Sequence, residues 1–217
     1  MIITQLVGKF LNLLYGPLSF MYGIVSWMVS FGQWRNWIDA VIPYLAGPTL
    51  LEIGYGPGYL LNRLQNGSYR LLGLDASRQM SRAALRRLRS ASPADKNRHT
   101  NGIVIRGSAL HIPLPTQSID TIVSTFPSPY IFDPHTLSEI RRVLKPTGRL
   151  LILLSVQPHG KTIPSAILSL LYRVTGESPR DPIIIESLVR KKFLDDGFEP
   201  GIEWLEVPHA RLLLIKI

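Results

Sequence analysis

The residues best placed to do chemistry are two carboxylates and three glycines, gathered around one predicted turn. Glu52 lies near the end of an apolar run, and Gly54, Gly56 and Gly58 follow it at alternate positions. Glycine lets the backbone turn sharply and leaves room for a ligand against the main chain. Asp75 ends the next apolar run of the chain. Together these residues predict a site for a polar ligand that carries hydroxyl groups and positive charge.

The elements that must position this turn are a buried strand and a helix. Residues 50–53 are mostly apolar and predict the strand, and the leucine-rich residues 59–64 predict the helix. A helix N-terminus offers free N–H groups to a polar ligand. A dinucleotide-binding turn needs Gly-x-Gly-x-x-Gly, but Tyr59 occupies the last position of that pattern. Glu52 would also repel a pyrophosphate, so the sequence favours a cationic ligand over a dinucleotide.

The pattern Glu52-x-Gly54-x-Gly56-x-Gly58 resembles motif I of the class I S-adenosylmethionine (SAM) methyltransferases. The resemblance implies SAM as the cofactor and S-adenosylhomocysteine (SAH) as its product. It implies that Glu52 lies near the methionine amine and that Asp75 accepts hydrogen bonds from the ribose hydroxyls. A second interpretation of Asp75 stays open, in which it only caps the helix that begins near residue 77.

Three further segments resemble the same family. Residues 107–115 are similar to Gly-Asp-Ala-x-x-Leu-Pro, with Ser108 in place of the usual acid, and residues 118–124 resemble motif IV. Residues 139–150 resemble Glu-x-x-Arg-Val-Leu-Lys-Pro-Gly-Gly-x-Leu, with Thr147 at one of the glycine positions. The resemblance covers about residues 48–155 and is closest to the ubiquinone/menaquinone-type and phospholipid-type small-molecule methyltransferases. It implies a cofactor site made of Glu52, Gly54, Tyr55, Gly56, Gly58, Asp75, Ala76, Ser108, Ala109, Ser124, Thr125 and Phe126.

The acceptor side of the site is less well marked. Tyr22, Tyr130 and His159 are the candidate catalytic residues, and packing or capping is the competing interpretation for each. Placing the donor methyl group and the acceptor in line can provide most of the acceleration, so a general base is optional.

Alternation of apolar runs with helical patterns predicts an α/β fold with a Rossmann-like, mostly parallel sheet of seven strands. The last two strands follow each other across residues 208–209 and predict an antiparallel hairpin at the C-terminal edge. Apolar helices over residues 1–45 precede the SAM-binding domain, residues 46–217, which contains an apolar insertion at 158–180. The predicted strands are 49–53, 69–74, 102–106, 119–125, 149–155, 201–207 and 210–217.

Composition limits the partners of the chain. The 217 residues carry a formal charge of +9, which predicts attraction to an anionic partner such as a membrane surface or a nucleic acid. Cysteine is absent and the five histidines show no ligand spacing, so no metal is expected.

The N-terminal segment favours the membrane. No charged residue lies between Lys9 and Arg35, and aromatic side chains are spread along this stretch. Gly16-Pro17 should break a helix there, so two short apolar helices, about 2–14 and 18–31, are expected in place of one span. Such helices can lie in the membrane interface or roof the active site.

The leading hypothesis is therefore a SAM-dependent methyltransferase that acts on an amphiphilic acceptor, either a phospholipid amine or a quinone precursor, at the cytoplasmic side of a membrane. Two alternatives stay open. An RNA or DNA methyltransferase would use the basic surface, and a non-catalytic module would bind SAM or lipid without turnover.

Overall fold

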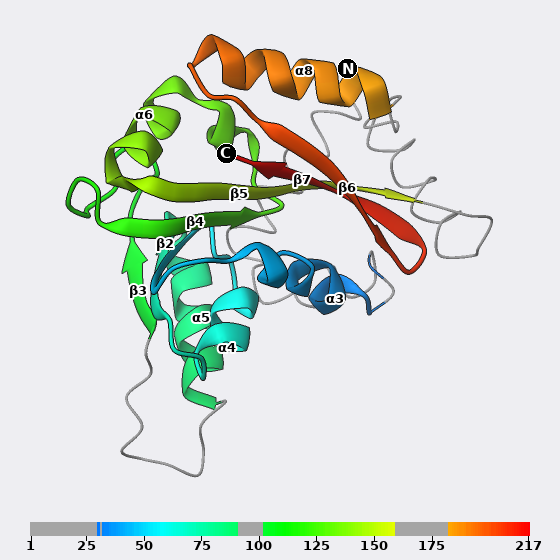
Figure 1. Cartoon of the computed structure of the whole chain (residues 1–217). Coiled ribbons are helices and arrows are strands. Elements are labelled where there is room, and N and C mark those ends of the chain that lie inside the picture. The colour runs from blue at the N-terminus through cyan, green and yellow to red at the C-terminus, as the bar shows by residue number, and fades with distance from the viewer. Residues whose placement is uncertain (1–29, 31, 91–101, 159–181) are drawn as a thin grey trace, which may run out of the picture.

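The protein folds around one seven-stranded sheet with helices on both faces (Figure 1). The computed structural model describes residues 30, 32–90, 102–158 and 182–217. The strand order is β3-β2-β1-β4-β5-β7-β6. The strands are β1 (Thr49–Ile53), β2 (Arg70–Asp75), β3 (Gly102–Arg106), β4 (Ile119–Thr125), β5 (Leu144–Pro158), β6 (Gly201–Val207) and β7 (Ala210–Lys216).

The direction of the strands confirms the predicted fold class. Strands β3, β2, β1, β4 and β5 pair in parallel, whereas β7 pairs antiparallel with both β5 and β6. The turn between β6 and β7 places His209 at a φ of 66° and brings Val207 opposite Ala210. The strand order reverses between β1 and β4, and in open α/β sheets ligands bind at the carboxyl ends of the strands at such a point.

Strand β5 begins earlier than the sequence predicts. The expected strand covered residues 149–155, but Leu144 already pairs with Ile119 of β4. An irregularity of register follows, and Lys145 Nζ lies 2.7 Å from Asp120 Oδ1. Pro146 and Gly148 suggest a break in the sequence, yet the neighbouring strand and this ion pair hold the segment extended.

Two helical layers cover the sheet. Helices α3 (Trp34–Asp39), α4 (Tyr59–Leu64) and α5 (Arg78–Ser90) pack on one face, and α6 (Pro134–Val143) and α8 (Pro182–Asp195) pack on the other (Figure 1). The described residues also include two short 3₁₀ turns, η2 (Ile42–Tyr44) and η3 (Pro129–Phe132).

Helix α5 shows how the sequence directs this packing. It buries Met80, Ala84 and Leu88, which lie four residues apart and so share one face. The arginines of α5 fall mainly on the other faces, so the helix presents a basic surface away from the sheet.

The predicted helices at about 2–14 and 18–31 and nearly all of the insertion at 158–180 lie outside the described residues. Within the described part, α3 and η2 precede the first strand, and the backbone turns through Gly47 at a φ of 74°. None of the described helices has the length and apolar character needed to cross a bilayer.

Candidate active site

The glycine-rich turn lies at the carboxyl end of β1 and leads into α4. All three glycines have positive φ, at 71° for Gly54, 52° for Gly56 and 75° for Gly58, a region that other residues rarely adopt. The Gly54 N–H donates to the Leu74 carbonyl at 2.7 Å, which ties the turn to β2. A Cβ added to Gly56 would meet no atom within 4 Å, whereas one added to Gly58 would lie 2.9 Å from Ala84 Cβ. The turn therefore has one open side, at Gly56, and one packed side, at Gly58.

Glu52 is a buried carboxyl group beneath this turn, with only 3% of its surface exposed. The Leu61 backbone and the Thr125 side chain act to lower its pKa, but its Oε2 atom has no hydrogen-bond partner. Burial, and to a smaller extent the charge of Asp75, raises the pKa of Glu52 to about 8. A buried carboxyl group with one unsatisfied oxygen is suited to accept a hydrogen bond from a cation that reaches it.

Asp75 links the ends of β1 and β2. Its Oδ2 atom accepts the Gly56 N–H at 2.9 Å, and its Oδ1 atom accepts the Ser77 N–H at 2.8 Å. Burial raises the pKa of Asp75, while these two backbone donors oppose that effect. The structure thus places Asp75 in contact with the turn and also gives it the capping contact that the sequence left open. A carboxylate offers about four acceptor positions, so a ligand hydroxyl can still bind there.

Two predicted site residues instead turn their side chains into the protein. The Tyr55 ring is buried against Gly73, and its hydroxyl lies 2.8 Å from Ser81 Oγ. Burial raises the pKa of Tyr55 to about 12. Ser124 is buried, and its hydroxyl donates to the Ile53 carbonyl at 2.7 Å, which joins β4 to β1. These two residues shape the site through their backbone and packing, with no side chain directed at an open space.

Tyr130, from η3, reaches over the first glycine of the turn. Its hydroxyl lies 3.3 Å from the Ile53 carbonyl and 3.3 Å from Ser124 Oγ. A Cβ at Gly54 would come within 2.3 Å of this hydroxyl, so a larger residue there would force the Tyr130 side chain to move. The structure therefore brings Tyr130 to the carboxyl ends of β1 and β4.

An aromatic pair borders the same edge of the sheet. Phe126 directly follows β4 with a φ of 49°, which is unusual for a residue other than glycine. Its ring lies 4.9 Å from the Trp34 ring, centroid to centroid, and its N–H donates to the Leu153 carbonyl. Strained backbone of this kind persists where the surroundings hold it, and it is concentrated at functional sites. Trp34 was not among the predicted site residues.

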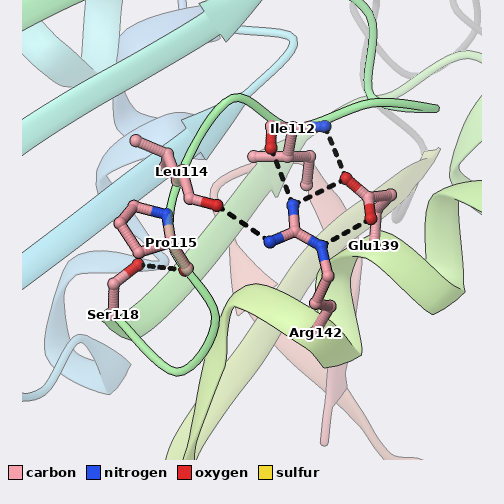
Figure 2. Close-up of polar contacts among 6 residues, drawn as sticks. All are labelled: Ile112, Leu114, Pro115, Ser118, Glu139 and Arg142. Carbon is pink, nitrogen blue, oxygen red and sulfur yellow. Dashed lines mark hydrogen bonds and ion pairs between the residues drawn. The ribbon is translucent and has the colours of Figure 1, made fainter.

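The segment 107–115, which resembles the family pattern Gly-Asp-Ala-x-x-Leu-Pro, is held by an arginine clamp (Figure 2). Arg142 of α6 donates to the carbonyls of Leu114 and Ile112 at 2.9 and 2.8 Å. Glu139, one turn earlier, accepts the Ile112 N–H at 2.7 Å and pairs with Arg142 at 2.6 Å. The hydrogen bond from Arg142 lowers the pKa of Glu139 to about 2. The clamp fixes the loop that carries Ser108 against α6.

We expect Arg142→Gln to loosen this loop and to weaken SAH binding about tenfold, because the variant loses charge-assisted bonds to two carbonyls and Glu139. Calorimetric titration with SAH measures this effect.

The pKa of Glu139 also predicts how the stability contributed by this ion pair depends on pH. Stability from this pair is complete above pH 4.5, the ordinary pKa of the group, and is lost as the pH falls toward 2. Arg141→Gln is the control, because this neighbouring guanidinium bonds the Asp196 carbonyl on the far side of α6. Equal SAH affinities in all three proteins would contradict the role of the clamp.

The remaining predicted residues divide into two groups. Ala76 and Ser108 are exposed and Ala109 is half-buried, and the Ser108 hydroxyl accepts the Leu110 N–H at 3.2 Å. Tyr22 and His159 lie outside the described residues. Within the described ranges, no group of three or more histidines and acids is placed to hold a metal ion.

The turn and its carboxyl groups fit the cofactor that the sequence motifs imply. SAM carries an ammonium group at one end and ribose hydroxyls near the middle, and the orphaned Glu52 Oε2 and the bridging Asp75 are matching acceptors. The open side of the turn at Gly56 leaves space for the part of SAM that would lie against the backbone. The strand order, the glycine turn and the paired acids define a class I SAM-dependent methyltransferase domain.

Comparison with known proteins agrees with this class of domain. Residues 51–152 match the family described as "Methyltransferase domain", and this match, the sequence relatives and the shared fold together indicate a SAM-dependent methyltransferase. It is 28% identical over 163 residues to a demethylmenaquinone methyltransferase of Symbiobacterium thermophilum, covering 71% of this chain and 62% of the relative. It is also 28% identical over 194 residues to a ubiquinone/menaquinone biosynthesis C-methyltransferase of Syntrophotalea carbinolica, covering 86% and 77%. The chain spans less than two thirds of the demethylmenaquinone methyltransferases that it matches.

Solved structures share the fold. A putative SAM-dependent methyltransferase of Methanococcus maripaludis superposes with a TM-score of 0.61 at 19% identity, over 88% of each chain. Geranyl diphosphate C-methyltransferase of Streptomyces coelicolor superposes with a TM-score of 0.57 at 18% identity, over 83% of this chain and 77% of the other. At these identities the likeness concerns the fold alone.

Proposed function

We propose that the protein transfers a methyl group from SAM to a planar, quinone-type ring that carries an apolar tail. When bound, SAM supplies an activated methyl group and departs as neutral SAH. The sequence relatives named as demethylmenaquinone and ubiquinone/menaquinone methyltransferases support this acceptor class. The structural observation that carries the proposal is the Trp34–Phe126 pair beside the glycine-rich turn.

The aromatic pair gives this site a preference for a flat ring. Both Trp34 and Phe126 are only partly buried, and their rings border the edge of the sheet where the glycine-rich turn begins. Aromatic rings stack on one another with a gain of about 0.5–1.5 kcal/mol beyond burial of area. A quinol ring offers that surface, whereas a phospholipid amine does not. On this proposal Trp34 and Phe126 orient the ring, and the Tyr130 hydroxyl borders the position of the reacting atoms.

An exposed apolar face on α8 supports the proposal that the protein functions at an anionic membrane surface. On α8, Ile183, Ile184, Leu188 and Leu194 are between 45% and 75% exposed. Lys191 lies seven residues after Ile184 and three after Leu188, so it shares their face. A helix face that combines apolar and basic side chains suits the boundary of an anionic bilayer. The formal charge of +9 has the sign that this partner requires. On this proposal the protein is peripheral to the cytoplasmic side of a membrane.

Label transfer from methyl-labelled SAM tests the acceptor. Purified protein is offered a short-chain demethylnaphthoquinol, phosphatidylethanolamine or RNA, each with and without phosphatidylglycerol vesicles. We expect label in the quinol, at a higher rate with vesicles. Trp34→Leu should lower kcat/KM for the quinol about tenfold while leaving SAH affinity unchanged, and Trp34→Phe should restore most of it because a ring remains. Label in the lipid amine or the RNA, or an equal loss in both Trp34 variants, would refute the quinol proposal.

A further inference from the structure

A cavity outside the glycine-rich turn combines basic side chains from three helices. It has a volume of about 350 Å³ and is lined by residues of α3, α4 and α5. Arg35, Arg63 and Arg87 contribute three guanidinium groups, and Asp39 contributes one carboxylate. Arg63 Nε already pairs with that carboxylate at 3.1 Å. The cavity therefore keeps positive charge on Arg35 and Arg87 that no lining acid balances.

Arg87 is held in place before any ligand arrives. Its guanidinium stacks over the Tyr59 ring, 4.0 Å from the centroid, and one of its NH groups donates to the Pro57 carbonyl. A guanidinium has five N–H donors in a fixed plane, so donors remain for another partner. Burial, with a contribution from the positive charge of Arg35, lowers the pKa of Arg87. Arg35 and Arg87 line the same cavity, so an anion bound there would be attracted by both positive charges.

We propose that this cavity, the arginine cavity of Arg35, Arg63 and Arg87, binds a phosphate group. Planar guanidinium groups match phosphate geometry and form paired, charge-assisted bonds with it. The side-chain amides of Asn36 and Asn62 also line the cavity and can donate to the same anion. The volume accommodates a small organic phosphate in addition to inorganic phosphate. The phosphate can belong to a dissolved compound or to a lipid headgroup.

The arginine cavity is separate from the proposed cofactor position, but its residue Arg87 contacts the glycine-rich turn that would hold the cofactor. Tyr59 directly follows Gly58, and the Pro57 carbonyl that Arg87 contacts lies within the turn. A phosphate in the arginine cavity would therefore hold Arg87 against the back of the turn without entering the open space at Gly56. SAH and phosphate should bind together, with no competition between them.

Calorimetric titration of the full chain with inorganic phosphate, at constant ionic strength, tests the site. We expect binding that weakens about tenfold in Arg35→Gln, an exposed position whose replacement leaves the fold intact, and in Arg87→Lys, which keeps charge but loses the planar fork. Arg82→Gln is the matched control, because it removes the same charge from the exposed side of α5 without lining the cavity. It should change the affinity less than twofold.

Three results would overturn the proposal: no heat with millimolar phosphate, an equal loss in Arg82→Gln, or displacement of phosphate by saturating SAH. A flotation assay then identifies the source of the phosphate. If dissolved phosphate releases the wild type from phosphatidylglycerol vesicles and Arg35→Gln floats poorly, the natural ligand is a lipid headgroup. If flotation is unchanged by both, the site serves a dissolved phosphate compound. Neither the titration nor the flotation assay depends on methyl transfer, so a failure of the quinol assay would not affect the test of the phosphate site.

Discussion

Replacing Gly56 with alanine should abolish measurable SAH binding while the protein stays folded. The added methyl group would meet no protein atom within 4 Å, so it would fill the open side of the turn, where the cofactor is proposed to lie. The φ of 52° adds a backbone cost of about 1–2 kcal/mol, which a domain of ordinary stability tolerates. Titration with SAH and urea denaturation of the same sample measure the two effects.

Gly58→Ala is the matched comparison, and we expect the opposite balance. Its φ of 75° carries a similar backbone cost, but the new Cβ would lie 2.9 Å from Ala84 Cβ and 3.2 Å from Ala84 Cα. Overpacking between α4 and α5 adds about 1–3 kcal/mol, so a total loss of about 2–5 kcal/mol is expected. If Gly56→Ala binds SAH like the wild type, or if both variants lose the same stability, the open side of the turn is not a ligand site.

The sequence predicted the fold well because its signals are local. Apolar runs bounded by proline and glycine mark the strands, and six of the seven begin within one residue of the expected position. Strand β5 departs from this because its first residues are extended by pairing with Ile119 and by the contact of Lys145 with Asp120. Those contacts join residues far apart in the sequence, and no local pattern records them.

The same distinction applies to the site. Glu52, the glycines and Asp75 follow one another along a strand–turn–helix–strand unit, so their neighbourhood could be predicted. The pair formed by Trp34 and Phe126 joins two segments separated by the whole glycine-rich turn and β2. The Glu-x-x-Arg pattern of α6 resembles a family motif, but its contacts with residues 112–114 depend on how α6 packs against that loop.

The directions of the Tyr55 and Ser124 side chains also depend on packing. Alternation along a strand identifies two faces, but it does not say which polar group will find an internal partner. Ser81 and the Ile53 carbonyl provide those partners here. Satisfying buried polar groups took precedence over presenting them to a ligand.

Glu52→Gln should separate cofactor binding from stability. In the wild type the pKa of Glu52 is raised to about 8 from an ordinary value of 4.5. Between these values the folded protein keeps a proton that the unfolded chain releases, so stability is complete below pH 4.5 and is lost as the pH rises through 8. Glutamine has no such proton. We expect the wild type, compared with Glu52→Gln, to lose stability on the order of 4 kcal/mol from pH 4.5 to pH 9.

Urea midpoints of the two proteins across this pH range measure the difference. Asp75 and Tyr55 also face this region and have raised pKa values, but both remain in the variant, so the difference between the curves isolates Glu52. Glutamine has nearly the same size as glutamate and keeps one side-chain oxygen near Leu61 and Thr125, the two groups that lower the pKa of Glu52.

SAH affinity should rise as the pH rises, whereas the stability of the wild type falls. An ammonium group that reaches the orphaned Oε2 favours the ionised carboxylate, so binding should release a proton near pH 7. Titrations in buffers of different ionisation enthalpy would detect that release in the wild type and its absence in Glu52→Gln. The variant should also bind SAH at least tenfold more weakly at pH 8. A carboxyl group that only supports the turn would change the pH dependence of stability without changing proton release or SAH affinity. If Glu52→Gln alters stability alone, Glu52 is not part of the binding site.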